Sequence, residues 1–258
     1  MTPDFSAGPH TSAIWHRVRP IIERTENLDF LNQLAQGTLE PIGFANYIRQ
    51  DSLYLIGYAR AMSLLAAKAP QRDQARFWAQ SSASAITVEE EMHEALLADT
   101  RLAQARAQLA ARHRQSATNA RSSAEGLPAD PTHVESSPTT LGYVSYLLAT
   151  AATESYAVGV AGVLPCFWVY AHMGKVLTER AGSLAADHPY ATWIAAYSSP
   201  EFDDSTRQAV SILEDQYGAA TDPERQQMNH AFEQACLYEW HFWASAHELQ
   251  GWERATNK

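Results

Sequence analysis

Apolar residues recur along this chain at the intervals of three and four positions that place side chains on one face of an α-helix. The first such stretch spans Thr11 to Thr25, and its apolar face consists of Ile14, Val18, Ile21 and Ile22. A longer stretch runs from Ile42 to Lys68, directly after a turn in which Pro41 suits the first helical position. The two stretches predict two helices, the second of them partly aromatic and central.

Four more segments show helical character. An Ala- and Glu-rich stretch covers Gln71 to Asp99, and later ones cover Tyr190 to Tyr197, the residues after Asp203-Asp204, and Pro223 to Ala246. Ala and Glu are strong helix formers. No alternation of apolar and polar residues persists anywhere, and no internal repeat is evident, so the sequence predicts an all-α fold.

The most apolar part of the chain extends from Thr139 to Thr178. Its polar Thr153-Glu154-Ser155 segment makes it unsuitable as a membrane span, and we expect it to form the buried centre of the protein. Pro165 lies inside this stretch and removes one backbone hydrogen bond. We therefore predict either two consecutive helices or one helix kinked at Pro165.

Residues 100–138 differ in composition from their surroundings. Ala, Arg, Gln and Ser dominate the first part, and a Pro- and Ser-bearing stretch follows up to Pro138. This composition is typical of an insertion or a linker. Residues 101–115 contain neither Gly nor Pro, so a protruding helical arm is an equally good interpretation. We expect one domain over residues 1–258.

Composition limits the kinds of partner. Hydrophobic residues make up 46% of the chain, which is enough for a packed core, and the formal net charge of −10 disfavours nucleic acid and anionic membranes as partners. Cys166 and Cys236 are far apart and form no CxxC pair, so a disulfide framework or a cysteine-rich zinc site is not expected. The first 20 residues contain no apolar signal region. We expect a cytoplasmic protein with a small-molecule ligand.

Three segments place one reactive group among large rings. Asp51 precedes Tyr54, Cys166 lies within Leu-Pro-Cys-Phe-Trp-Val-Tyr, and Glu239 lies within Tyr-Glu-Trp-His-Phe-Trp. Burying a carboxylate costs several kcal/mol, so an inward-facing acid needs a partner or a ligand. Each group taken alone is better explained as a core carboxyl that meets a hydroxyl, or as an inert core thiol.

Four blocks taken together, in their order along the chain, resemble the TenA/thiaminase II family. They are Gly37-Thr38-Leu39, Phe44-xx-Tyr47-xx-Gln50-Asp51-xx-Tyr54-Leu55, Leu164-Pro165-Cys166-Phe167-Trp168-xx-Tyr170 and Tyr238-Glu239-xx-Phe242-Trp243. The resemblance covers roughly Trp15 to Trp252, apart from residues 100–138, which are longer than expected of the family. It implies a haem-oxygenase-like helical bundle, a homotetramer or dimer, and no metal or organic cofactor.

The resemblance also implies a reaction and a set of roles. The family hydrolyses an aminopyrimidine from degraded thiamin to ammonia and hydroxymethylpyrimidine, and its members can also cleave thiamin. By motif position, Cys166 resembles the nucleophile that adds to the pyrimidine ring, Asp51 the acid that binds the aminopyrimidine edge, and Glu239 the acid/base. The residues that resemble the ring-flanking and orienting tyrosines are Tyr54, Tyr143, Tyr170 and Tyr197. Tyr146 and Tyr156 are alternatives to Tyr143.

Two other functions remain open at this point. Glu90-x-x-His93 has the spacing of a di-iron ligand pair in helical bundles, although no second Glu-x-x-His occurs in the chain. An ion pair on a helix surface between Glu89 and His93 is the simpler interpretation of that segment. A non-catalytic helical protein that binds a pyrimidine in an aromatic groove is the third function class.

Overall fold

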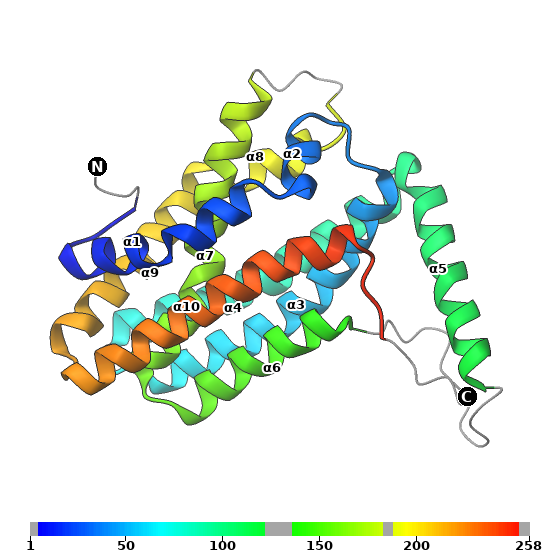
Figure 1. The fold of residues 1–258 in the computed structure, drawn as a ribbon. Coiled ribbons are helices and arrows are strands. Elements are labelled where there is room, and N and C mark those ends of the chain that lie inside the picture. The colour runs from blue at the N-terminus through cyan, green and yellow to red at the C-terminus, as the bar shows by residue number, and fades with distance from the viewer. Residues whose placement is uncertain (1–4, 122–135, 183–187, 253–258) are drawn as a thin grey trace.

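The computed structural model describes residues 5–121, 136–182 and 188–252 of the chain; the side chains of residues 88–97 and 113–121 are outside this description. The described residues form helices and no strands (Figure 1). In chain order the helices are α1 Pro9–Glu26, α2 Asp29–Ala35, α3 Pro41–Lys68, α4 Arg72–Ala98, α5 Thr100–Arg121, α6 Pro138–Thr153, α7 Tyr156–Ala181, α8 Ala191–Ala196, α9 Pro200–Ala219 and α10 Asp222–His247.

The long helices agree closely with the periodicity of the sequence. α1, α3, α4 and α10 each begin and end within a few residues of the predicted bounds, because each carries an apolar face and a Pro or polar residue near its start. The α9 helix begins before Asp203-Asp204, at Pro200, where the Ser199 side chain accepts a hydrogen bond from the backbone N–H of Phe202. The seven-residue α2 is too short to show a period and was not expected.

The break that the sequence predicted at Pro165 lies elsewhere. Two helices do form in the apolar stretch, but the break lies between α6 and α7, at Glu154 and Ser155. Ser155 accepts a hydrogen bond from the backbone N–H of Val158, and Lys68 donates to the carbonyl of Glu154 at 2.8 Å. α7 continues through Pro165, where burial of the surrounding residues offsets the single lost backbone bond.

The helical arm is the interpretation of the 100–138 region that the structure supports. α5 projects to one side of the bundle (Figure 1). It is attached through a small apolar cluster in which Leu109 and Ala105 pack with Ala45 of α3. Residues 122–135, the Pro- and Ser-bearing part, lie outside the described residues.

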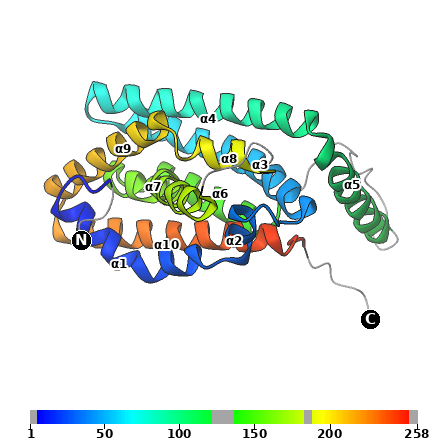
Figure 2. The ribbon, with the colours of Figure 1, turned by 90° about the horizontal axis from the view of Figure 1, so that it is seen from above.

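The centre of the bundle is α7, as Figure 2 shows from above. It packs against α1, α2, α3, α6, α8, α9 and α10. By length and composition this helix could cross a membrane, but 89% of its most apolar window is buried inside the protein, as in a core helix. A helix with neighbours on nearly all sides can bring side chains from several helices to one place.

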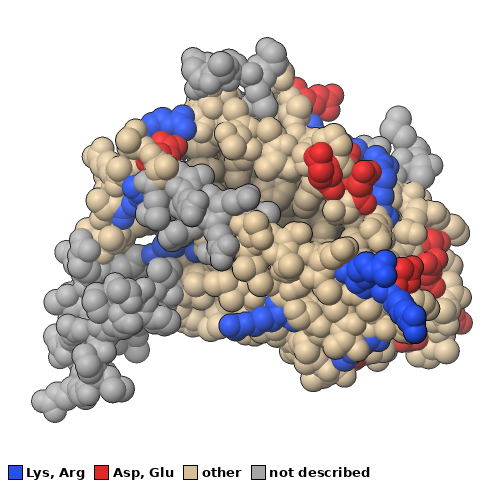
Figure 3. All heavy atoms as spheres, turned by 180° about the vertical axis from the view of Figure 1, so that it is seen from behind, with Lys and Arg blue, Asp and Glu red and all other residues tan. Residues whose placement is uncertain are grey.

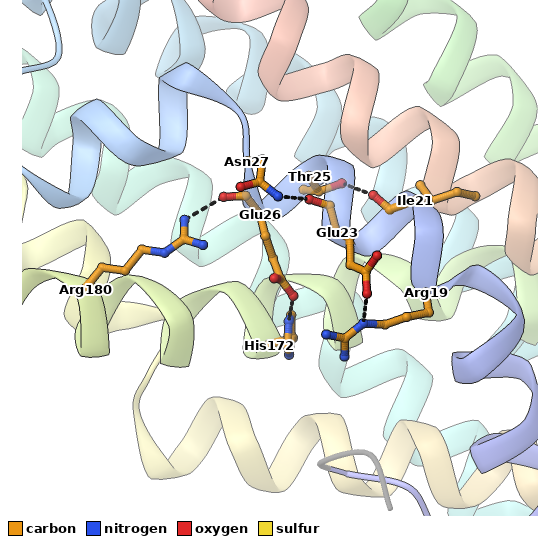
Figure 4. A network of polar contacts seen from close by, with 8 residues as sticks. All are labelled: Arg19, Ile21, Glu23, Thr25, Glu26, Asn27, His172 and Arg180. Carbon is orange, nitrogen blue, oxygen red and sulfur yellow. Dashed lines mark hydrogen bonds and ion pairs between the residues drawn. The ribbon is translucent and has the colours of Figure 1, made fainter. Parts of the chain in front are cut away.

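Polar contacts attach the end of α1 to α7 (Figure 4). His172 Nε2 lies 2.7 Å from Glu26 Oε1, and Arg180 donates to the backbone carbonyl of Glu26 at 2.5 Å. Both partners of the first contact are mostly buried, whereas the Arg19–Glu23 pair beside it is exposed and contributes little to stability. On the face drawn in Figure 3, Lys and Arg side chains are in separate patches.

Candidate active site

Asp51, Cys166 and Glu239 come from three helices, α3, α7 and α10. Asp51 is 2% exposed and Glu239 is 1% exposed, whereas Cys166 retains some accessible surface among buried neighbours. The charges of both carboxyl groups act on the Cys166 thiol, and both also act on the hydroxyls of Tyr170 and Tyr197. The structure therefore brings together the three reactive groups that the sequence singled out.

Aromatic rings enclose the thiol on the α3 and α6 side. The Tyr54 ring lies 5.0 Å from that of Tyr143 and 5.4 Å from those of Tyr58 and Phe242. These centroid separations are those of favourable aromatic pairs, which pack tightly and exclude water. The thiol thus borders rigid apolar walls that suit a flat ring.

Tyr143 is the tyrosine that contacts the acid of α10. Its hydroxyl donates to Glu239 Oε1 at 2.5 Å, the length of a strong charge-assisted bond. The two alternatives have other partners: Tyr146 donates to the carbonyl of Ala231, and Tyr156 bonds to Trp78. This geometry agrees with the orienting role that the sequence resemblance implies for Tyr143.

Tyr170 and Tyr197 form a second wall. Their ring centroids are 4.8 Å apart, and the hydroxyl of Tyr170 lies 3.2 Å from that of Tyr47 on α3. A glycine allows this contact: a Cβ atom at Gly174 of α7 would overlap the backbone oxygen of Tyr197. Only glycine lets the two backbones approach so closely. The segment after α8 is thereby held against α7.

Both carboxyl groups hold their protons far more tightly than usual. Burial raises the pKa of Asp51 from 3.8 to about 8. Burial also raises the pKa of Glu239 to about 8, where the charge of Asp51 adds to the shift and the Tyr143 hydrogen bond opposes it. Near neutral pH such groups can both release and accept a proton, which general acid–base chemistry requires.

The thiol of Cys166 is not activated in the free protein. Burial and the charge of Glu239 raise its pKa well above the usual range, although the hydroxyls of Tyr54 and Tyr58 oppose the shift. A thiol must become a thiolate before it attacks. The nearby network therefore has to accept the proton of Cys166, because the two hydroxyls do not offset the effect of burial on its pKa. Cys236 is buried as well, and burial raises the pKa of its thiol too.

Several buried polar atoms of the site have no hydrogen-bond partner within the described part of the chain. They include Asp51 Oδ2 and the indole Nε1 of Trp193. Unpaired buried polar groups are costly and rare in folded proteins. A ligand with both donors and acceptors would satisfy them.

Sequence reasoning assigned no role to four residues that the structure adds to the site: Tyr47, Tyr58, Trp193 and Phe242. Two of them had a usable signal. Tyr47 precedes Asp51 by one helical turn, and Phe242 follows Glu239 by three residues, so each shares a helix face with an acid. Trp193 gave no such signal, because its helix contributes no acid or thiol.

Within the described residues, no group of three His, Cys, Asp or Glu side chains is arranged to hold a metal ion. The side chains of Glu89, Glu90 and His93, on which the di-iron alternative depends, are outside the described residues.

Comparison with known proteins decides the family. The model of the TENA/THI-4/PQQC family matches residues 15–249. The chain belongs to this family. That membership confirms the resemblance of the chain to TenA proteins.

Relatives at moderate identity include a thiamine biosynthesis protein and aminopyrimidine aminohydrolases. The multifunctional thiamine biosynthesis protein ThiED of Corynebacterium glutamicum is 33% identical over 95% of this chain, but the chain spans only 28% of that protein. The aminopyrimidine aminohydrolase of Halalkalibacterium halodurans is 28% identical, over 93% of this chain and 96% of its own length. That of Bacillus subtilis is 27% identical, over 89% and 86%.

Solved structures share the TenA fold. A TenA homologue from Pyrococcus furiosus superposes with a TM-score of 0.73 at 21% identity, over 92% of this chain and 100% of that one. A protein from Shewanella denitrificans, described as having a haem-oxygenase-like fold, superposes with a TM-score of 0.60 at 12% identity, over 92% and 90%. The expected haem-oxygenase-like bundle is confirmed.

Proposed function

We propose that this chain hydrolyses an aminopyrimidine from degraded thiamin, releasing ammonia and hydroxymethylpyrimidine, and that it can cleave thiamin at the same site. Family membership and the aminopyrimidine aminohydrolases among the relatives support the reaction class. The observation that carries the proposal is the meeting of one thiol and two buried carboxyls inside aromatic walls. A flat, polar, electron-poor ring matches such a site.

Asp51 binds the edge of the pyrimidine in this proposal. A carboxyl group can accept a hydrogen bond from the exocyclic amino group and donate one to the adjacent ring nitrogen. The second bond needs the protonated acid, and the raised pKa of Asp51, about 8, keeps that proton in place at neutral pH. The unpaired Oδ2 of Asp51 gains a partner at the same time.

Cys166 supplies the nucleophile. Its proton passes to a carboxylate as a bond forms between Sγ and a ring carbon, and the electrons of the attacked ring bond move to a ring nitrogen, which takes a proton from Asp51. The ring electrons then expel the amine from the exocyclic carbon. Water adds to that carbon. The ring nitrogen then returns its proton to Asp51, and the thiolate leaves and regains its proton from Glu239, which restores the aromatic ring.

Glu239 moves protons for the leaving group and for water. As an acid it gives a proton to the departing amine, and as a base it takes one from the incoming water. Tyr143 holds the carboxyl in place and stabilises its ionised form through the 2.5 Å bond. Tyr54 and Tyr170 flank the ring, and Tyr197 orients the ligand.

The test compares the two cysteines in the purified protein. Aminomethyl-aminopyrimidine and thiamin are supplied separately, and the consumption of each is measured. Replacing Cys166 with Ala should lower turnover by about a thousandfold or more, because the covalent route is lost. Replacing Cys236 with Ala should change turnover by less than about tenfold, because only packing is altered.

Three outcomes would contradict the proposal. A Cys166→Ala protein that keeps most of its activity excludes the covalent mechanism. A wild-type protein that binds the pyrimidine but consumes neither compound points to the non-catalytic alternative. Activity that chelators abolish, together with bound iron, favours the di-iron alternative.

We further propose that the protein acts in the cytoplasm as a homo-oligomer, a tetramer or dimer. The TenA family membership supports both statements. Light scattering of the purified protein measures the mass directly; a monomer of 28.5 kDa would contradict the second statement.

A further inference from the structure

Trp193 of α8 carries a buried hydrogen-bond donor without a partner. The residue is 7% exposed, and its indole Nε1 contacts no acceptor within the described part of the chain. Two other indoles are paired: Trp78 donates to the hydroxyl of Tyr156 at 2.8 Å, and Trp252 donates to the carbonyl of Ser136 at 2.9 Å. Unpaired buried donors are costly and rare in folded proteins. The presence of such a donor beside the candidate site calls for an explanation.

The indole lies against three tyrosines of the candidate site. Its ring centroid is 4.8 Å from that of Tyr197, 5.6 Å from that of Tyr47 and 6.5 Å from that of Tyr170. Burial raises the pKa of each of these tyrosines, and the charge of Asp51 adds to each shift. Trp193 therefore borders the end of the site where Asp51 lies.

The chemistry of an aminopyrimidine leaves one ring nitrogen for such a donor. Asp51 can pair with the amino group and the ring nitrogen next to it, but the second ring nitrogen stays an acceptor that needs a donor. When a thiol adds to the ring, negative charge develops on the ring nitrogens. A fixed donor in a dry site then becomes more favourable, as in an oxyanion hole.

We propose that the indole N–H of Trp193 donates a hydrogen bond to the second ring nitrogen of the pyrimidine. This inference rests on the proposed function and adds a binding and specificity residue to it. Trp193 makes the site selective for rings with two nitrogens, because a ring with C–H at that position leaves the indole donor unpaired.

Trp243 provides a matched control. Its indole Nε1 also lacks a partner among the described residues, and the residue is fully buried. Of the tyrosines of the site, however, its ring contacts only Tyr170, at 4.7 Å. Replacing either tryptophan with Phe removes one unpaired N–H and part of one ring, so only the position differs.

The experiment measures the binding of three ligands by calorimetry. They are the hydroxymethyl-aminopyrimidine product and two analogues, in each of which C–H replaces one ring nitrogen. The wild-type protein should bind the analogue without the second nitrogen about tenfold more weakly than the product, equivalent to about 1.4 kcal/mol. Trp193→Phe should bind the product about tenfold more weakly and show no further loss with that analogue.

Other outcomes overturn the inference. Equal binding of that analogue and the product by the wild-type protein excludes a donor at the second nitrogen, and this result needs no variant. An equal loss for all three ligands in Trp193→Phe, or the same loss pattern in Trp243→Phe, indicates a packing effect. If the wild-type protein binds and converts no aminopyrimidine, the proposed function fails, whereas normal binding with an unaffected Trp193→Phe rejects only the role of Trp193.

Discussion

Replacing Asp51 with Asn should stabilise the ligand-free protein increasingly as the pH rises. The folded protein holds the Asp51 proton with a pKa of about 8, whereas the ordinary value is 3.8. When folding raises the pKa of a carboxyl group, the folded state has its full stability only at a pH below the pKa of that group in the unfolded chain, where both states are protonated. That stability is lost as the pH rises from about 4 to about 8, because the unfolded chain ionises first.

The size of the effect follows from the two pKa values. Each pKa unit corresponds to about 1.4 kcal/mol, so ionisation of the unfolded chain favours unfolding by roughly 1.5 kcal/mol at pH 5 and roughly 5 kcal/mol at pH 8. The side chain introduced by Asp51→Asn does not titrate, although its buried amide brings a cost that is the same at every pH. Relative to wild type, Asp51→Asn should thus gain about 3–4 kcal/mol between pH 5 and pH 8.

The assay is urea unfolding at pH 5, 6, 7 and 8 without ligand, supported by Tm measurements. For a protein of this size the gain corresponds to a relative rise in Tm of roughly 10 °C. Asp204→Asn, which alters an exposed carboxylate of α9, is the control and should follow the wild type across this range. Parallel stability profiles for Asp51→Asn and wild type would refute the buried, protonated state of Asp51. The variant should also lose substrate binding.

Three further predictions concern protons and packing. The plot of kcat/KM against pH should be bell-shaped and centred near pH 8, because one carboxyl must be protonated and the other ionised, and both have pKa values of about 8. Tyr143→Phe removes the bond that lowers the pKa of Glu239, so the acid limb should move to higher pH; an unchanged limb would exclude Glu239 as its origin. Gly174→Ala should destabilise the protein by about 1–3 kcal/mol, since the added Cβ meets the backbone of Tyr197. Gly218→Ala is the control, because a Cβ there meets no atom within 4 Å, and it should stabilise α9 by about 0.5–1 kcal/mol. Chemical denaturation measures both variants, and equal effects of the two substitutions would contradict the close approach at Gly174.

The helices themselves could be predicted from the sequence because helical order is a local property. The apolar face of α1, the Pro at the start of α3 and the uniform composition of α4 all act within a few residues of one another. The same local reasoning misplaced the break in the apolar stretch. Pro165 is a strong local signal, but it lies inside α7, where the surrounding residues are buried, and the break lies instead at Glu154 and Ser155, where Ser155 caps α7 and Lys68 of another helix contacts the carbonyl of Glu154.

The residue types of the candidate site were likewise visible in the sequence, as an acid or thiol among rings in four ordered blocks. Their meeting was not, because Asp51 and Glu239 are nearly two hundred positions apart and become neighbours only when α3 and α10 pack together. Burial decides their pKa values, and burial is a property of the whole bundle. The sequence by itself determined which helices form and which reactive groups they carry. Only the tertiary structure decided which of those groups share a site and which protons they hold. It also placed Trp193, an indole with no local signal in the sequence, beside them. These properties arise from contacts between distant segments, which no local pattern can predict.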